Sequence, residues 1–342
     1  MTDHTTHHAA DGYRNNYPTG WTRGSFWKWQ WERWTKGLPK PLPPGWHSQT
    51  VQPDIAWLKS NRTETAITWV GHATLLLQVG GLNILTDPHF TERASPLSFL
   101  GPRRLVPPLP ALAELPHIDA VVISHNHYDH LDEGSVRQLA AQAGGSPRFF
   151  VPLGLKAWFA GKGIDDVVEL DWWQAVELAG VKLTLAPVQH WSARSLWDRD
   201  KTLWGGWRVE RPGFSFFFCG DTGYSEDFND IRKRLGPVDL AAIPIGAYEP
   251  RWFMKVMHVN PDEAVKIHRD LGAVQSIAMH WGTFILTDEP VDEPPQRLAA
   301  ALRAAGIEAD RFALMKHGET RRLKGSDGIS RGVAPRRSAA SR

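Results

Sequence analysis

Four potential metal ligands stand within six residues at the end of an apolar segment, and this feature restricts the fold more than any other. The segment DAVVIS is followed directly by His125, Asn126, His127, Tyr128, Asp129 and His130. Because side chains alternate along a strand, His125 and His127 are expected on one side of its end, and a turn must then bring Asp129 and His130 back. Imidazole and carboxylate are ligands of zinc and similar cations, and four exceed what one open catalytic metal needs. The cluster predicts two metals. A polar surface loop with three histidines is the alternative.

Three further residues of a type that can bind metal each follow an apolar segment elsewhere in the chain. TLAPVQH ends at His190, FFFCGD at Asp221 and SIAMH at His280. Each of them alone would more often be a capping or hydrogen-bonding residue. Together with the first cluster they provide seven ligands, the number that two metals need if one carboxylate bridges them. We therefore expect these segment ends to meet at the rim of a sheet, where loops build sites.

The order of the expected elements favours an α+β fold. Short segments rich in β-branched and aromatic residues recur from residue 64 onward, and helix-like stretches lie among the later ones, at 133–143, 225–235, 261–271 and 294–305. Strands come first and strands mixed with helices follow. That order suits two packed sheets covered by helices better than a doubly wound parallel sheet.

The chain of 342 residues is expected to have three parts. Residues 1–60 form a basic extension rich in Trp and Pro, of which the first 20 are expected to be disordered. Residues 61–323 form the main domain, and residues 324–342 a disordered basic tail. Residues 61–315 hold 24 Lys and Arg against 31 Asp and Glu. Nucleic-acid binding is not expected, because it needs basic groups gathered on a folded surface.

Compartment signals favour the cytoplasm. The N-terminus has no apolar core of a secretory signal, and no run of about 18 apolar residues occurs. The single cysteine, Cys219, excludes an internal disulfide and fits a reducing compartment. Cys219 lies on an apolar segment two residues before Asp221 and is expected in the core.

The ligand pattern and its surroundings resemble the metallo-β-lactamase superfamily. H-x-H-x-D-H is its signature, and DPHFTERASP and AYEPRWFMK resemble more specifically the N-acyl-phosphatidylethanolamine-hydrolysing phospholipase D branch, over about residues 64–322. The resemblance implies an αββα sandwich, two mixed β-sheets with helices on both outer faces. It also implies a zinc-dependent phosphoric diester hydrolase. Such an enzyme would release N-acylethanolamine and phosphatidic acid by attack of a metal-bridging hydroxide on phosphorus.

The resemblance also implies roles for the metal ligands, with two Zn²⁺ per chain. One zinc is expected on His125, His127 and His190 and the other on Asp129, His130 and His280, with Asp221 bridging both. Asp87, in LTDP, resembles a buried acid that orients the ligand loop, and a turn-forming Asp before Pro is the alternative. Iron or manganese is the alternative to zinc.

The resemblance further implies residues for catalysis and substrate binding. Asp129, Asp221 and His258 are expected to be catalytic, although His258 could equally be a satisfied core residue. Five residues are expected to line the substrate mouth, with ordinary packing as the alternative: Tyr248, Arg251, Trp252, Phe253 and Met254. Arg251 suits a phosphodiester anion. His72 is expected to be structural beneath the site, and His4, His7 and His8 to be tail residues.

Metal ligands do not identify a substrate, so other functions stay open. A hydrolase of this fold could cleave a lactone, a cyclic phosphodiester or another phosphoester. A non-catalytic protein that binds a membrane surface and keeps a metal site is the second alternative. The sequence leaves a homodimer open.

The segment Trp21–Trp34 places five tryptophans among basic residues. Trp27, Trp31 and Trp34 follow helical spacing, and tryptophan favours the headgroup boundary of a bilayer. Together with a phospholipid substrate, this predicts peripheral contact with the inner face of a membrane. Because Trp29 falls off the stripe, a hydrophobic strap packed on the main domain is the alternative.

Overall fold

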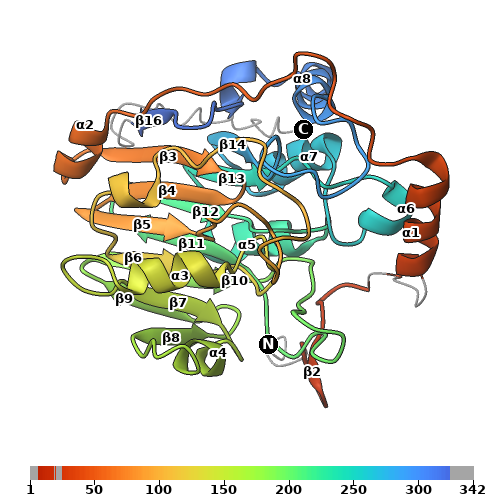
Figure 1. Ribbon diagram of the computed structural model, residues 1–342. Helices are drawn as coiled ribbons and strands as arrows, with labels where there is room; N and C mark the ends of the chain where they lie inside the picture. The colour runs from red at the N-terminus through yellow and green to blue at the C-terminus, as the bar shows by residue number, and fades with distance from the viewer. Residues whose placement is uncertain (1–6, 19, 21–24, 324–342) are drawn as a thin grey trace, which may run out of the picture.

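The computed structural model describes residues 7–18, 20 and 25–323. Within these residues two seven-stranded sheets pack face to face, with helices on both outer faces (Figure 1). The αββα sandwich expected from the sequence is therefore confirmed. Trp21, His4 and the tail 324–342, for which predictions were made, lie outside the described residues.

The first sheet has the order β16-β3-β4-β5-β6-β7-β8. It is antiparallel from β16 to β5 and parallel from β5 to β8. Its strands in chain order are β3 (Thr65–Gly71), β4 (Thr74–Val79), β5 (Leu82–Thr86), β6 (Ala120–Val122), β7 (Arg148–Pro152), β8 (Val167–Leu170) and β16 (Thr320–Leu323).

The second sheet has the order β15-β14-β13-β12-β11-β10-β9 and repeats this design. It is antiparallel from β9 to β12 and parallel from β12 to β15. Its strands are β9 (Ala175–Leu178), β10 (Val181–Ala186), β11 (Gly206–Arg211), β12 (Phe214–Phe218), β13 (Leu240–Pro244), β14 (Gln275–Met279) and β15 (Phe312–Ala313). Most strands are buried on both faces, because a sheet in the middle of the sandwich meets apolar layers on each side.

Helices cover the outer face of each sheet. The first sheet is covered by α2 (Ile55–Ser60), α3 (Glu133–Ala140) and α4 (Lys156–Ala160), and the second by α5 (Asp227–Leu235), α7 (Pro261–Asp270) and α8 (Glu293–Ala305). α1 (Ser25–Lys36) lies against α6 (Arg251–Met254) at one side of the molecule (Figure 1). The short 3-10 turns are η1 (Leu112–Glu114) and η2 (Ala309–Arg311). Asn260 caps α7 through a capping box with Glu263, and Pro261 occupies its first turn.

The N-terminal strap, residues 7–18, corrects one expectation. These residues were predicted to be disordered, but β1 (His8–Ala9) and β2 (Gly12–Tyr13) pair as a small hairpin. Asn16 Nδ2 donates to Asp227 Oδ1 (2.8 Å), and the Tyr17 hydroxyl donates to Asp230 Oδ2 (2.6 Å). Polar contacts therefore hold the strap against the domain. A segment held by polar contacts shows no apolar periodicity in its sequence, so the sequence pattern did not predict this structure.

Candidate metal centre

All seven expected metal ligands meet at one rim of the sandwich. His125 follows β6, His190 follows β10, Asp221 follows β12 and His280 follows β14. β5 and β6 are parallel neighbours in one sheet, as are β12, β13 and β14 in the other, so their carboxyl ends open onto the same edge. The loops that leave this edge therefore bring residues far apart in the sequence to one place.

The first group of ligands consists of His125, His127 and His190. His127 Nδ1 lies 2.8 Å from His125 Nε2 and 3.3 Å from His190 Nε2. His127 Nδ1 cannot form a full hydrogen bond to both of these nitrogens, because a ring nitrogen offers either one hydrogen or one lone pair. Three imidazole nitrogens facing one point fit a cation of the zinc class.

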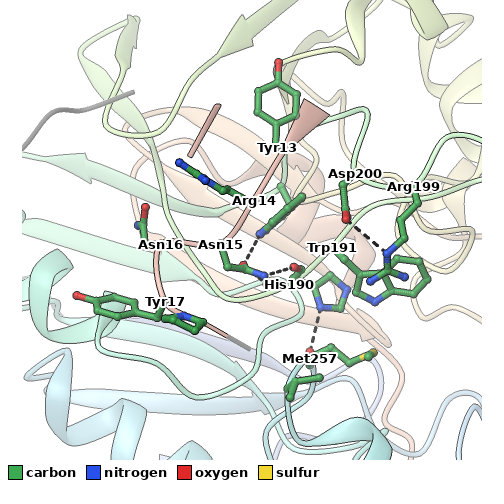
Figure 2. Close-up of a pocket in the computed structure, with 13 residues that line it drawn as sticks. Tyr13, Arg14, Asn15, Asn16, Tyr17, His190, Trp191, Arg199, Asp200 and Met257 are labelled. Carbon is green, nitrogen blue, oxygen red and sulfur yellow. Dashed lines mark hydrogen bonds and ion pairs between the residues drawn. The ribbon is translucent and has the colours of Figure 1, made fainter. Parts of the chain in front are cut away.

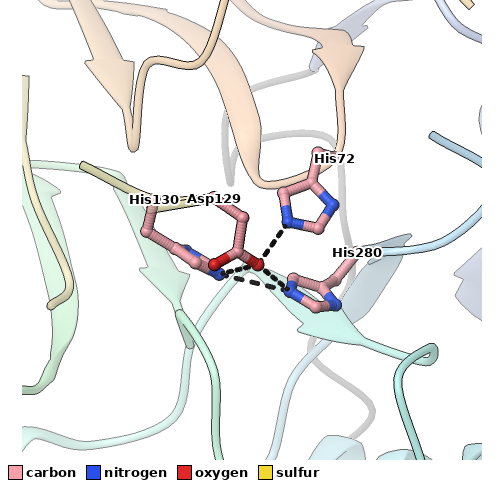
Figure 3. A group of neighbouring side chains, drawn as sticks. All are labelled: His72, Asp129, His130 and His280. Atoms are coloured by element: carbon pink, nitrogen blue, oxygen red, sulfur yellow. Dashed lines mark hydrogen bonds and ion pairs between the residues drawn. The ribbon is translucent and has the colours of Figure 1, made fainter. Parts of the chain in front are cut away.

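The second group consists of Asp129, His130 and His280, and His72 joins it (Figure 3). Asp129 Oδ2 lies 3.4 Å from both His130 Nε2 and His280 Nε2, and these two nitrogens are 3.2 Å apart. His72 Nε2 lies 3.0 Å from the same Asp129 oxygen. These four side chains could also hold a metal ion.

Asp221 lies between the two groups. Its Oδ2 is 3.1 Å from His130 Nε2 and 4.0 Å from His190 Nε2, and its Oδ1 is 3.0 Å from His280 Nε2. The carboxylate thus faces a member of the first group and two members of the second. A bridging ligand needs this position, because each oxygen can serve a different cation.

Charge in the cluster also fits a cation. Burial opposes the Asp221 anion, but His130, His280 and His258 around it outweigh burial and hold the pKa of Asp221 well below its ordinary value. Burial disfavours charge on His280 too, yet the two carboxylates raise its pKa to about 9. Burial lowers the pKa of His127 to about 4, which keeps that imidazole neutral. The two carboxylates favour positive charge on the groups next to them. Bound divalent cations would provide that charge.

Asp87 contacts the loop of candidate ligands from behind. His130 Nδ1 lies 2.6 Å from Asp87 Oδ2, and Ser124 donates to both Asp87 oxygens from its backbone N–H and its hydroxyl. A ring nitrogen bonded to a carboxylate fixes the imidazole so that its other nitrogen faces the centre. The carboxyl is fully buried, and burial raises its pKa. The orienting role of Asp87 rests on these contacts with Ser124 and His130 and stays a prediction.

Three of the seven non-glycine residues that have a positive φ in the described part of the chain lie at this centre. His72, Asp87 and His280 have φ values of 54°, 31° and 62°, a region that residues other than glycine seldom adopt. Such conformations persist where the surrounding structure fixes them, and they are frequent at functional sites. His72 was expected to be structural beneath the site. In the structure its side chain is buried and contacts Asp129 directly.

The structure brings His258 to the centre but directs two other residues elsewhere. His258 Nδ1 lies 3.8 Å from Asp221 Oδ2, so His258 is not a remote core residue. The Arg251 guanidinium bonds Glu263 Oε2 (2.7 Å) and the His258 carbonyl (2.8 Å). It braces the loop with these contacts, as the packing alternative expects. Tyr248 also agrees with the packing alternative, because it is fully buried and donates to Glu293 Oε1 (2.7 Å).

Of the other residues expected at the substrate mouth, Trp252 is exposed while Phe253 and Met254 are buried. Phe253 stacks on Trp29 of α1, with ring centroids 5.2 Å apart, and Met254 belongs to the same apolar cluster. The expectation that Phe253 and Met254 face substrate is therefore corrected: they hold α1 against the domain.

A cavity of about 700 Å³ adjoins the first group, and the strap forms one of its walls (Figure 2). His190 lies in its lining beside Trp191, Arg199 and Met257. Asn15 of the strap clasps the His190 backbone, with its Nδ2 donating to His190 O (2.8 Å) and its Oδ1 accepting from His190 N (3.0 Å). The volume lies within the range of small-molecule pockets. No local sequence pattern marks Asn15, because its partner is a backbone 175 residues away.

Comparisons with known proteins agree with this geometry. Residues 82–281 match the family model described as a Beta-lactamase superfamily domain. The chain is 45% identical over 248 residues to the N-acyl-phosphatidylethanolamine-hydrolyzing phospholipase D 1 of Caenorhabditis elegans, covering 69% of each protein. It is 36% identical to the mitochondrial N-acyl-phosphatidylethanolamine-hydrolyzing phospholipase D of Saccharomyces cerevisiae, over 74% of this chain and 55% of the yeast protein.

Solved structures show the same architecture. A metallo hydrolase from the archaeon Ignicoccus hospitalis superposes with a TM-score of 0.57 at 21% sequence identity, covering 77% of this chain and 99% of that one. At this identity the likeness concerns the fold.

Proposed function

Because the chain belongs to the β-lactamase superfamily, in the branch of the N-acyl-phosphatidylethanolamine-hydrolysing phospholipases D, we propose that it is a phosphodiesterase acting on such phospholipids. The products would be N-acylethanolamine and phosphatidic acid. One observation carries the proposal: seven ligands meet at one rim, with the Asp221 carboxylate between two groups that could each hold a metal ion.

In this proposal the centre holds two zinc ions. His125, His127 and His190 hold one, Asp129, His130 and His280 hold the other, and Asp221 is shared. Two such cations, when bound, lower the pKa of a water and offset charge on phosphate oxygens. The chain supplies a fixed frame for them, since Asp87 and the His190 backbone contacts hold ligands from behind.

His258 is proposed to contact the phosphate. Burial lowers its pKa to about 4, so the ring is neutral near pH 7 and still carries one N–H. A ring with so low a pKa is not protonated near pH 7, so it has no proton to transfer as an acid there. It can donate a hydrogen bond to a phosphoryl oxygen, which is the role that its place beside Asp221 favours.

A membrane surface is proposed as the place where substrate is met. Trp27, Trp31 and Trp34 on α1 are 74%, 63% and 75% exposed, and Leu196 and Trp197 project from the loop after His190. Exposed tryptophans and basic residues on one helix suit the headgroup boundary of an anionic bilayer. As far as residues 7–323 are described, no helix has the length and apolar character of a membrane span.

Product analysis tests the proposal. Zinc-loaded protein is offered N-acyl-phosphatidylethanolamine, a lactone and a cyclic nucleotide in parallel, before and after treatment with a chelator. We expect turnover of the phospholipid, its loss on chelation and its recovery when zinc is added back. Turnover confined to the lactone or the cyclic nucleotide would contradict the substrate class while leaving the metal centre standing. Turnover that survives complete metal removal would contradict the centre.

A further inference from the structure

Two histidines of the strap converge on one carboxylate of the main domain that is not among the seven candidate ligands at the sheet rim. His7 Nε2 lies 2.6 Å from Asp171 Oδ1, and His8 Nε2 lies 2.8 Å from Asp171 Oδ2. Asp171 directly follows β8, a strand that supplies none of the seven ligands at the sheet rim. Both imidazoles thus present the same nitrogen to one acid, from segments more than 160 residues apart.

The three side chains are packed against the protein on one side and are open to solvent on the other. The His7 ring is buried and stacks on Trp172, with centroids 4.4 Å apart and planes 27° from parallel. Asp171 Oδ1 also accepts the Trp172 backbone N–H (2.7 Å). The His8 side chain is 40% exposed and meets Tyr13 edge-on. Solvent therefore reaches the cluster past His8 while His7 and Asp171 stay in place.

We propose that His7, His8 and Asp171 form a separate site for a divalent transition metal of the zinc class, which fastens the strap to the domain. Two imidazole nitrogens and a carboxylate are three of the four ligands that such an ion takes, and water on the His8 side can complete the set. The three donor atoms lie close enough together for one ion. When the proton of each neutral ring sits on Nδ1, both Nε2 lone pairs face the ion.

The site has a consequence for the strap as a whole. An ion that binds the folded arrangement and not the detached strap stabilises the folded arrangement by mass action. The strap also carries Asn15, whose side chain clasps the backbone of His190, and it walls the 700 Å³ cavity. A metal ion bound by His7, His8 and Asp171 would therefore hold the strap in place as a wall of the cavity. It would do so without contacting the ligands at the sheet rim.

The test compares the full chain with Asp171→Asn and His8→Gln, using zinc as the only added ligand. An asparagine can still accept an imidazole N–H but is a poor metal ligand, so Asp171→Asn separates a metal site from a hydrogen-bonded clasp. His8→Gln removes a half-exposed side chain with little cost to packing. His47→Gln, which changes an exposed histidine bonded to the carbonyl of Gly45, is the matched control.

Zinc per chain is measured by elemental analysis after equilibrium dialysis, and protection of residues 7–18 by hydrogen–deuterium exchange with and without zinc. We expect each test variant to bind one equivalent less than wild type and to lose zinc-dependent protection of the strap, while His47→Gln behaves as wild type. The difference of one equivalent holds whatever number the sheet rim binds. Unchanged zinc content in either test variant would overturn the proposal and leave a hydrogen-bonded clasp.

Discussion

Asp221 is the side chain on which the metal centre depends most. Its two oxygens face His130 and His280 on one side, and His190 lies on the other. An amide cannot supply two anionic oxygens, so Asp221→Asn is expected to lose metal from both groups and to abolish turnover. Elemental analysis of protein purified without chelator should find about two equivalents of zinc fewer in the variant than in wild type.

His258→Ala is the matched comparison, because His258 lies beside Asp221 but holds no metal in the proposed centre. Loss of a phosphate contact should lower turnover by roughly 10²-fold while metal content and folding stay unchanged. If the variant keeps full activity, or loses metal along with it, then His258 does not have the proposed role.

His317 should make folding stability depend on pH. Its buried ring lies between two hydroxyls, Ser48 Oγ at 2.9 Å from Nδ1 and Thr283 Oγ1 at 2.8 Å from Nε2. Burial and then Arg104 lower its pKa to about 3 in the folded chain, against about 6.5 when unfolded. The unfolded chain therefore binds more protons between these values, so the stability that neutral His317 contributes is complete above about pH 6.5 and is lost as pH falls.

His317→Gln isolates this effect, since a neutral amide can bond both hydroxyls and does not titrate. Melting temperatures of both proteins are measured from pH 7.5 to 4.5 under identical metal conditions. We expect the melting temperature of wild type to fall more steeply than that of the variant. Parallel curves would contradict the lowered pKa.

Residues that lie at strand ends could be predicted, and residues defined by distant partners could not. The ligands at 125–130, 190, 221 and 280 each follow an apolar segment, so local pattern alone marks them. Arg251 was assigned to substrate because its charge suits phosphate, but its charge is neutralised by Glu263 on α7. Asn15 gave no signal, because it binds main-chain atoms of a residue that is near only in the folded chain.

Helix α1 divides its tryptophans between two roles. Trp29 is 7% exposed and donates to Asp288 Oδ2 (2.7 Å), whereas Trp27, Trp31 and Trp34 face outward. Contact with a membrane and packing on the main domain, the two alternatives for this segment, therefore apply to different tryptophans. Replacing Trp27, Trp31 and Trp34 together with Ala should weaken binding to anionic vesicles and leave the melting temperature within a few degrees of wild type, because these rings bury little surface on the domain.

Trp29→Ala is the control on the same helix. It removes a buried ring and a hydrogen bond, so it should lower the melting temperature clearly. Vesicle flotation and thermal melting of both variants decide the matter. Unchanged vesicle binding in the triple variant would contradict the membrane proposal, and a melting temperature that falls as far as in Trp29→Ala would mean that the outward rings also pack.

Helices with an apolar periodicity could be predicted from the sequence, and segments held by polar contacts could not. The stretches 133–143, 225–235, 261–271 and 294–305 correspond to α3, α5, α7 and α8, because each has an apolar face against a sheet. The strap was predicted to be disordered. The strap is held by Asp227, Asp230 and the backbone of Asp200, and such partners cannot be identified from the strap's own composition.

At the scale of the whole molecule, the strand arrangement that both sheets share explains where the candidate ligands lie. Each sheet passes from an antiparallel to a parallel half, and strands of the two parallel halves end at the shared rim. The sandwich therefore brings the candidate ligands to one edge of both sheets. The α+β class and the seven candidate ligands could therefore be predicted from local patterns. The pairing order of strands needed the structure, because it depends on contacts between segments far apart in the sequence.

The most direct test of the proposed activity is hydrolysis of N-acyl-phosphatidylethanolamine by zinc-loaded protein in ¹⁸O-labelled water, with mass analysis of every product. Attack of water at phosphorus breaks the bond between phosphorus and the ethanolamide oxygen, so one ¹⁸O atom should appear in phosphatidic acid and none in N-acylethanolamine. Label in N-acylethanolamine would mean cleavage of its carbon–oxygen bond, and label in a released fatty acid would mean cleavage of an acyl bond. Either result would contradict a phosphodiesterase of the phospholipase D type.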